Sequence, residues 1–193
     1  MEFKHHVLID SDLESQAAII QNIPVFKGWL RAYNDIKQAL DFILEIEAPY
    51  SIEIYLARND VFNDGLPSET NSRMRNLLQT LSDLQTVHHI NVYSPNVDIE
   101  LRAQLTSILD DKRVLRNTLA VMDLYVYMCN EGISYFKGLI SYCKLKNELH
   151  LIAIFQRSVD DLHSHLDKVC TDQRRRNQSL IADYGDKLGL EAF

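Results

Sequence analysis

Residue types that usually carry ligand chemistry are scarce in this sequence. Glycine occurs six times and proline four times among 193 residues, and neither a G-x-G-x-x-G nor a G-x-x-x-x-G-K-[S/T] motif is present. Nucleotide enzymes with doubly wound sheets normally hold phosphates on such a glycine-rich loop. The absence of both motifs argues against an enzyme of that kind, and we expect no cofactor.

Cysteine and positive charge are also in short supply. The three cysteines, Cys129, Cys143 and Cys170, cannot all pair within one chain, which favours reduced thiols and a cytoplasmic protein. A formal charge of −7 and a pI near 5.4 argue against nucleic acid and anionic membranes as partners. The longest apolar stretch, residues 119–143, is too often interrupted by polar residues to predict a membrane span.

An uninterrupted heptad pattern occupies the C-terminal third. Apolar residues alternate at spacings of three and four over residues 119–143, and a second series runs from 152 to 169. The polar stretch 144–147 between them predicts a turn. The pattern therefore predicts a long antiparallel helical hairpin over residues 118–185, with a flexible tail at 186–193.

Residues 1–117 have a different character and predict a small α/β module. Strands are expected where short apolar or alternating runs occur, at residues 7–9, 51–57, 87–93 and 113–115. Helical patterns lie at residues 13–21, 35–47, 73–84 and 98–109, while residues 25–33 fit either a strand or a linker. Strands that alternate with helices of this length predict a parallel sheet. The alternative is an all-α bundle in which the apolar runs are buried turns.

Polar residues near the ends of these strands follow the order seen in a signalling family. Asp10 and Asp12 follow the first predicted strand, Asp60 comes just after the strand at 51–57, Ser94 ends the next strand, and Lys112 precedes the last. In this respect residues 5–118 resemble the receiver domain of two-component signalling, a five-stranded flavodoxin-like fold.

One receiver position carries a different residue type. The resemblance implies a phosphorylated aspartate at the end of the third strand, where this sequence has Ala57 or Arg58. The resemblance therefore implies a pseudo-receiver, a fold retained for contacts after the phosphorylation chemistry has been lost.

The leading hypothesis is a non-enzymatic regulatory or scaffolding protein that acts through its helical hairpin. The hairpin would bind a second copy of the chain, forming a homodimer, or a protein partner, and buried apolar area would supply the free energy. The same side chains would instead be internal core if the hairpin packs within one chain, and the sequence leaves both possibilities open. The residues assigned to this interface are Met122, Val126, Ile133, Phe136, Ile140, Phe155, Val159, Leu162 and Leu166.

The alternative hypothesis is an enzyme or phosphorelay protein. It would use Mg²⁺ or a small molecule at the acidic cluster of Asp10, Asp12 and Asp60, since carboxylate oxygens suit Mg²⁺. The predicted loop at 59–71 is the best candidate ligand site under this hypothesis.

Histidines elsewhere favour structural roles. Asp160, Asp161, His163 and His165 share helix faces, but no second acid-x-x-His copy accompanies them, so they predict a salt-bridged helix edge and no metal site. The pairs His5-His6 and His88-His89 adjoin predicted strands. Adjacent strand residues point to opposite faces, so neither pair is expected to form a two-ligand site.

Overall fold

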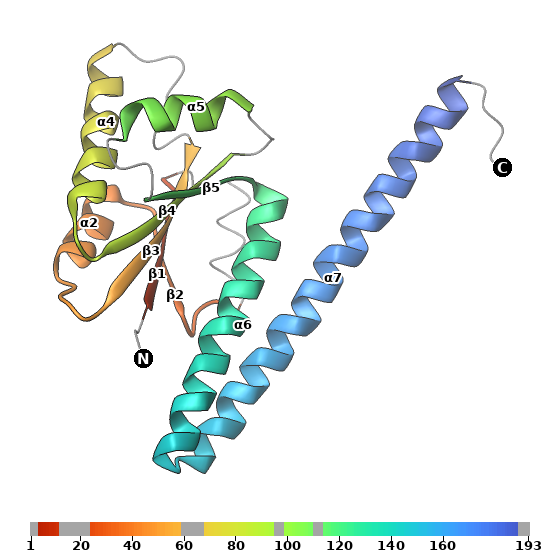
Figure 1. The fold of residues 1–193 in the computed structure, drawn as a ribbon. Helices are drawn as coiled ribbons and strands as arrows, with labels where there is room; N and C mark the ends of the chain where they lie inside the picture. Colours follow the sequence, from red (N-terminus) through yellow and green to blue (C-terminus); the bar gives the residue numbers. More distant parts are fainter. Residues whose placement is uncertain (1–3, 12–23, 59–67, 95–98, 110–113, 189–193) are drawn as a thin grey trace. The chain divides into compact units, whose positions relative to one another are not determined.

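A computed structural model of the chain contains a five-stranded parallel sheet and a long C-terminal helical pair (Figure 1). The structure describes residues 4–11, 24–58, 68–94, 99–109 and 114–188. It divides into two compact units, Met1–Leu124 and Tyr125–Phe193. The helix expected at 13–21 and the residues Asp12, Asp60 and Lys112 lie outside the described ranges.

The sheet consists of β1 (Lys4–Ile9), β2 (Leu30–Tyr33), β3 (Ser51–Ala57), β4 (Val87–Ser94) and β5 (Leu115–Ala120). All neighbouring pairs are parallel, and the strand order is β2-β1-β3-β4-β5. This is the order of flavodoxin-like sheets, in which the sense of the strand order changes between β1 and β3. The α/β prediction is confirmed, and the all-α alternative is wrong.

One face of the sheet is apolar and is covered by helices α2 (Ile36–Leu44), α4 (Ser68–Asp83) and α5 (Ile99–Ile108). Every second residue of β3 (Ile52, Ile54 and Leu56) joins this core with no exposed surface. Asp35 caps α2, as its side chain accepts hydrogen bonds from the backbone N–H groups of Lys37 (2.7 Å) and Gln38 (3.3 Å). Figure 1 shows these three helices together beside the sheet.

Two elements differ from their sequence-based predictions. The last strand is not at 113–115 but at Leu115–Ala120, so Leu119, the first residue of the predicted heptad pattern, belongs to the sheet. A leucine suits the apolar side of a helix or of a strand, and the pairing with β4 places this residue in the strand. The predicted loop at 59–71 is shorter than expected, because residues 68–71 already belong to α4. The ambiguous stretch 25–33 supplies β2.

The C-terminal unit is a pair of helices, α6 (Val121–Lys146) and α7 (Leu149–Leu188). Asn147 adopts a positive φ of 59° between them. The N–H of Glu148 bonds to the carbonyl of Cys143 (2.9 Å), and the N–H of Asn147 bonds to that of Lys144 (3.3 Å). These two bonds form a Schellman motif, in which Asn tolerates the left-handed position. The helix α7 continues to Leu188, into residues expected to form a tail.

Candidate functional site

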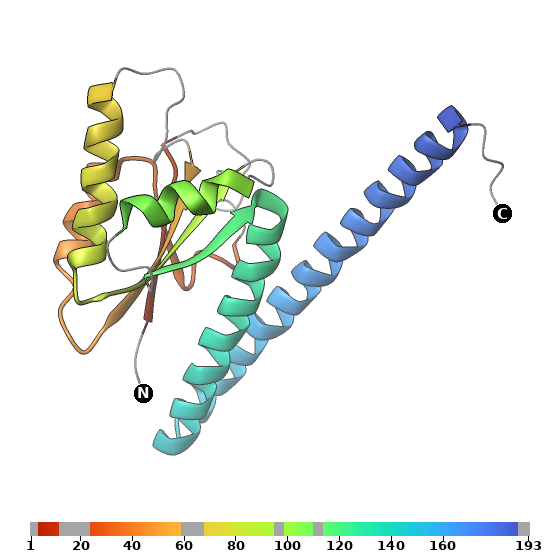
Figure 2. The same ribbon diagram turned by 45° about the horizontal axis from the view of Figure 1, so that its top comes forward.

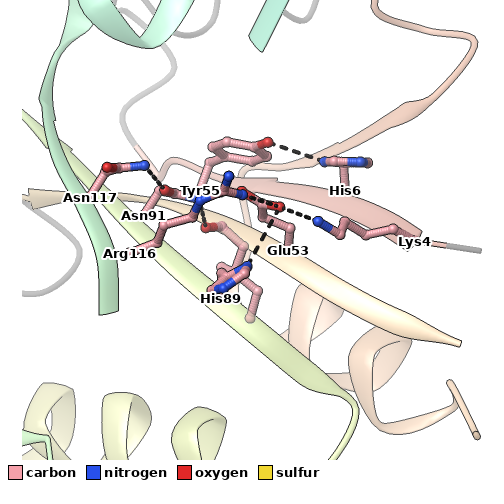
Figure 3. Close-up of polar contacts among 9 residues, drawn as sticks. Lys4, His6, Glu53, Tyr55, His89, Asn91, Arg116 and Asn117 are labelled. Atoms are coloured by element: carbon pink, nitrogen blue, oxygen red, sulfur yellow. Dashed lines mark hydrogen bonds and ion pairs between the residues drawn. The ribbon is translucent and has the colours of Figure 1, made fainter. Parts of the chain in front are cut away.

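The second face of the sheet is polar at its centre. Glu53 on β3 is fully buried, and it lies in register with His6 on β1 and His89 on β4. Parallel sheets usually bury apolar side chains on both faces. The polar residues grouped around Glu53 are called the Glu53 network below and consist of Lys4, His6, Glu53, Tyr55, His89, Asn91, Arg116 and Asn117 (Figure 3).

The carboxylate of Glu53 receives hydrogen bonds from three strands. Lys4 Nζ on β1 donates at 2.9 Å, Asn91 Nδ2 on β4 donates at 2.9 Å, and Arg116 Nη1 on β5 donates to both oxygens at 3.2 and 3.3 Å. A buried carboxylate is tolerated only when charge and hydrogen bonds replace the lost hydration. Glu53 therefore ties β1, β4 and β5 to β3.

Two register shifts help to assemble this network. The pairing of β4 with β5 shifts between Ile90/Leu115 and Asn91/Asn117, so that Arg116 is an additional β5 residue between these two pairs. Bulges of this kind redirect a side chain. As a result the consecutive residues Arg116 and Asn117 both reach the network, where Asn117 Nδ2 donates to Asn91 Oδ1 at 2.9 Å. A similar shift between β3 and β4 leaves His88 unmatched, and its ring lies 4.5 Å from that of His89.

His6 joins the network to an aromatic cluster. Its Nδ1 lies 3.1 Å from Tyr55 Oη, and its ring meets Trp29 edge-on with centroids 4.7 Å apart. Burial lowers the pKa of His6 to about 4, although the nearby Glu53 carboxylate opposes this shift. His6 is therefore neutral at pH 7. His5 points to other neighbours, Phe42 and Tyr50, as expected for adjacent strand residues.

Of the predicted acidic cluster Asp10, Asp12 and Asp60, the structure describes only Asp10, at the carboxyl end of β1. Asp10 is buried just after β1, and its Oδ2 accepts a hydrogen bond from Tyr93 Oη at 2.8 Å. Ser94 ends β4 and is buried, and Ala57 ends β3, where a receiver would carry its phosphorylated aspartate. Asp12 and Asp60 lie outside the described residues, so an acidic cluster at this edge stays a prediction.

The helical pair places the predicted interface residues along its length. The rings of Phe136 on α6 and Phe155 on α7 lie 6.0 Å apart, and those of Tyr125 and His165 lie 6.5 Å apart. Lower residue numbers on α6 therefore lie beside higher residue numbers on α7, so the two helices are antiparallel. Ile133, Phe136, Ile140, Val159 and Leu162 are buried, while Val126, Phe155 and Leu166 are half-buried. The side chain of Met122 is not among those described, and the assignment of these residues to an interface stays a prediction.

The cysteines of this unit are free thiols. Cys129 is buried, and this burial raises its pKa to about 12, with a smaller contribution from Cys170. A thiol with so high a pKa is a poor nucleophile at pH 7. Cys129 therefore acts as a small apolar side chain of α6.

The Glu53 network was not predicted from the sequence. In the run Ser51-Ile52-Glu53-Ile54, the alternation predicts that Glu53 lies on the face opposite the apolar core. A glutamate on that face is ordinarily exposed to solvent, so nothing in this run indicates that Glu53 is buried. Only the coincidence of polar residues at matching positions of β1, β4 and β5 marks a shared buried site. That coincidence requires the strand register, which the sequence alone does not provide.

Comparisons with known proteins identified no relative of this chain. No protein-family model matches the chain, and no match was found among curated proteins or solved structures. Among the described residues, no helix is long and apolar enough to cross a membrane.

Replacing Glu53 with Gln tests the network. The substitution keeps the side-chain size but removes the charge that Lys4 and Arg116 face, so we expect the free energy of unfolding to fall by about 3 kcal/mol. The control is Glu45→Gln, at the exposed C-terminal end of α2, with an expected change within about 0.5 kcal/mol. Urea denaturation measures both, and equal effects of the two substitutions would contradict the role given to Glu53.

The low pKa of His6 predicts a loss of stability in acid. Between pH 6.5 and 4 the unfolded chain protonates this histidine while the folded chain does not, so the free energy of unfolding falls as the pH falls. The shift corresponds to a loss of about 2 kcal/mol between pH 7 and pH 5. Denaturation of the His6→Gln variant should show a correspondingly shallower pH dependence. The exposed His150→Gln should retain the full dependence, and an unchanged slope in His6→Gln would refute the prediction.

Leu162 tests the packing of the helical pair. Its side chain is fully buried on the same face of α7 as Phe155, so Leu162→Ala should lower the free energy of unfolding by about 2–5 kcal/mol. Ile154, on the same helix, is 57% exposed, and Ile154→Ala should change it by no more than about 0.5 kcal/mol. Helical circular dichroism during denaturation reports both values. A Leu162→Ala variant as stable as the native chain would mean that this residue does not hold α7 in place.

Proposed function

We propose that this chain is a non-enzymatic regulatory or scaffolding protein that makes its contacts through the helical pair α6–α7. The α/β unit would then be a pseudo-receiver. The same pair would support self-association or the binding of a protein partner. The observation that carries this proposal is the length of α7 compared with its antiparallel neighbour.

The helix α7 has 40 residues and α6 has 26. At a rise of 1.5 Å per residue, these lengths correspond to about 60 Å and about 39 Å. Because Tyr125, near the start of α6, lies beside His165, the residues of α7 beyond about 172 extend past the first turn of α6. Both views show α7 as a straight helix that continues beyond α6 (Figures 1 and 2). Isolated helices are marginal in water, so a contact along this extension would stabilise it.

Exposed apolar side chains lie at the other end of the pair. Leu145 and Leu149 flank the turn at Asn147 and are 86% and 69% exposed, and Ile154, farther along α7, is 57% exposed. Scattered single apolar residues are ordinary on a protein surface, whereas a group of large ones marks a contact site. This group supports the proposal that the helical pair has a binding role.

The α/β unit supports a non-enzymatic role at one position. The end of β3 carries Ala57, which has no group that accepts a phosphoryl transfer. The carboxylate of Asp10, just after the neighbouring strand β1, accepts a hydrogen bond from the hydroxyl of Tyr93. These two features support a fold retained for contacts.

Light scattering behind size exclusion, over a series of protein concentrations, tests the proposal. We expect the mass to rise from 22.3 kDa toward about twice that value as the concentration increases, because a symmetric contact follows mass action. A mass of 22.3 kDa at every concentration would overturn self-association through the helical pair.

A further inference from the structure

A hollow of about 720 Å³ lies at the amino ends of β3 and β4. Its volume falls within the range of about 300–1,000 Å³ that small-molecule sites occupy. It is at the opposite end of these strands from Ala57 and Ser94, and so apart from the edge that a receiver would use. The name Ser51 hollow is used for it, and its walls are residues 47–51 together with Gln85, Thr86 and His88.

Hydrogen bonds of the backbone hold the two walls of the Ser51 hollow in place. The N–H of Tyr50 donates to the carbonyl of Glu47 at 3.1 Å and closes a turn in the first wall. The N–H of Ile52 donates to the carbonyl of Thr86 at 2.7 Å and joins this wall to the second. The ring of Tyr50 also lies 5.5 Å from that of His5 on β1. A ligand would therefore meet a preformed site and would not have to order its walls.

One wall of the hollow contains a buried hydroxyl group without a protein partner. Ser51 is 6% exposed, and among the described residues no group forms a hydrogen bond with its Oγ atom. Buried polar atoms are nearly always hydrogen-bonded. The Oγ atom therefore marks a position at which a bound molecule would supply the missing hydrogen bond.

The charges around the hollow argue against an anionic ligand. Glu47 is the only acid among the wall residues, and these residues include neither lysine nor arginine. Lys4 pairs with Ser51 in the sheet, but its ammonium group is bonded to the carboxylate of Glu53 at 2.9 Å. A phosphate or carboxylate ligand would be repelled by Glu47 with no cation in the walls to compensate.

The remaining polar side chains of the walls suit a ligand rich in hydroxyl groups. A hydroxyl both donates and accepts hydrogen bonds, whereas an ammonium ion only donates. The wall residues that likewise do both are Tyr50, Ser51, Gln85, Thr86 and His88.

An apolar surface accompanies these polar groups. Ala48 and Pro49 belong to the same wall, and the neighbouring Tyr50 is 45% exposed. A sugar ring presents hydroxyl groups at its edge and C–H groups on its faces. It therefore matches both the polar and the apolar parts of the hollow.

From these observations we propose that the Ser51 hollow binds a sugar ring, as a free monosaccharide or as one unit of a glycan. A hydroxyl of the sugar forms the hydrogen bond that Ser51 Oγ lacks in the protein, and a C–H face packs on Tyr50. This inference goes beyond the proposed function and does not depend on the helical pair.

Amide chemical shifts of the whole chain, measured by nuclear magnetic resonance, test the proposal. The probes are D-glucose, D-galactose, D-mannose and N-acetyl-D-glucosamine, each added up to about 50 mM. At least one should produce saturable shifts at the amides of residues 47–51 and 85–88. The methyl glycosides of these sugars distinguish the two sources, since a site for a glycan unit accepts the glycoside and a site for a free sugar does not.

Two substitutions assign the binding to the hollow. Ser51→Ala should raise the dissociation constant about fivefold, while its thermal unfolding should match that of the native chain because no hydrogen bond within the protein is lost. Gln85→Ala, at an exposed wall position, should weaken binding about threefold. The control is Gln38→Ala at an exposed position of α2, with an expected change within about 1.5-fold.

Three results would overturn the proposal. They are the absence of saturable shifts with every sugar, binding that neither Ser51→Ala nor Gln85→Ala weakens, and binding of n-butylammonium or phosphate in preference to every sugar. Each of them would leave the proposed role of the helical pair standing.

Discussion

A carboxylate without solvent contact constrains the whole α/β unit. Glu53 is fully buried at the centre of the sheet, and its oxygens accept hydrogen bonds from Lys4, Asn91 and Arg116. A slip of any one strand by a single residue would move its donor to the opposite face and leave the charge uncompensated. The network therefore sets the alignment of β1, β3, β4 and β5. The position of Arg116 at the register shift between β4 and β5 is one local consequence of that requirement.

The same carboxylate explains why the two faces of the sheet differ. Ile52, Ile54 and Leu56 fill the apolar face beneath α2, α4 and α5, while the alternate residues Glu53 and Tyr55 point to the polar face. A parallel sheet that is apolar on both faces is stabilised by its buried apolar surface area. A sheet with one polar face also gains specificity, because polar groups have fewer acceptable partners than apolar ones. The neutral His6 beside Tyr55 belongs to that face and gives it a dependence on pH.

The sequence predicts those parts of this structure that depend on local pattern. The alternation in residues 51–57, the helical pattern at 35–47 and the heptads after residue 121 each correspond to an element of the expected type. The heptad spacing placed Leu119 in a helix, and this prediction was wrong because Leu119 pairs with Tyr93 of β4 and belongs to β5. The Glu53 network depends on register and on two bulges, which are properties of strand pairs and not of any one segment. Arg116 and Asn117 illustrate this point, because alternation places them on opposite faces and the bulge brings both to one site.

The proposed function depends on the helical pair, because α7 is longer than α6 and extends past it. The most direct measurement is the distance between spin labels on the two copies, by double electron–electron resonance, with Cys170 replaced and labels placed in turn at Gln156 and Asp161. Self-association through the helical pair predicts a defined intermolecular distance at both positions. The absence of any intermolecular distance would indicate a monomer and would contradict the account.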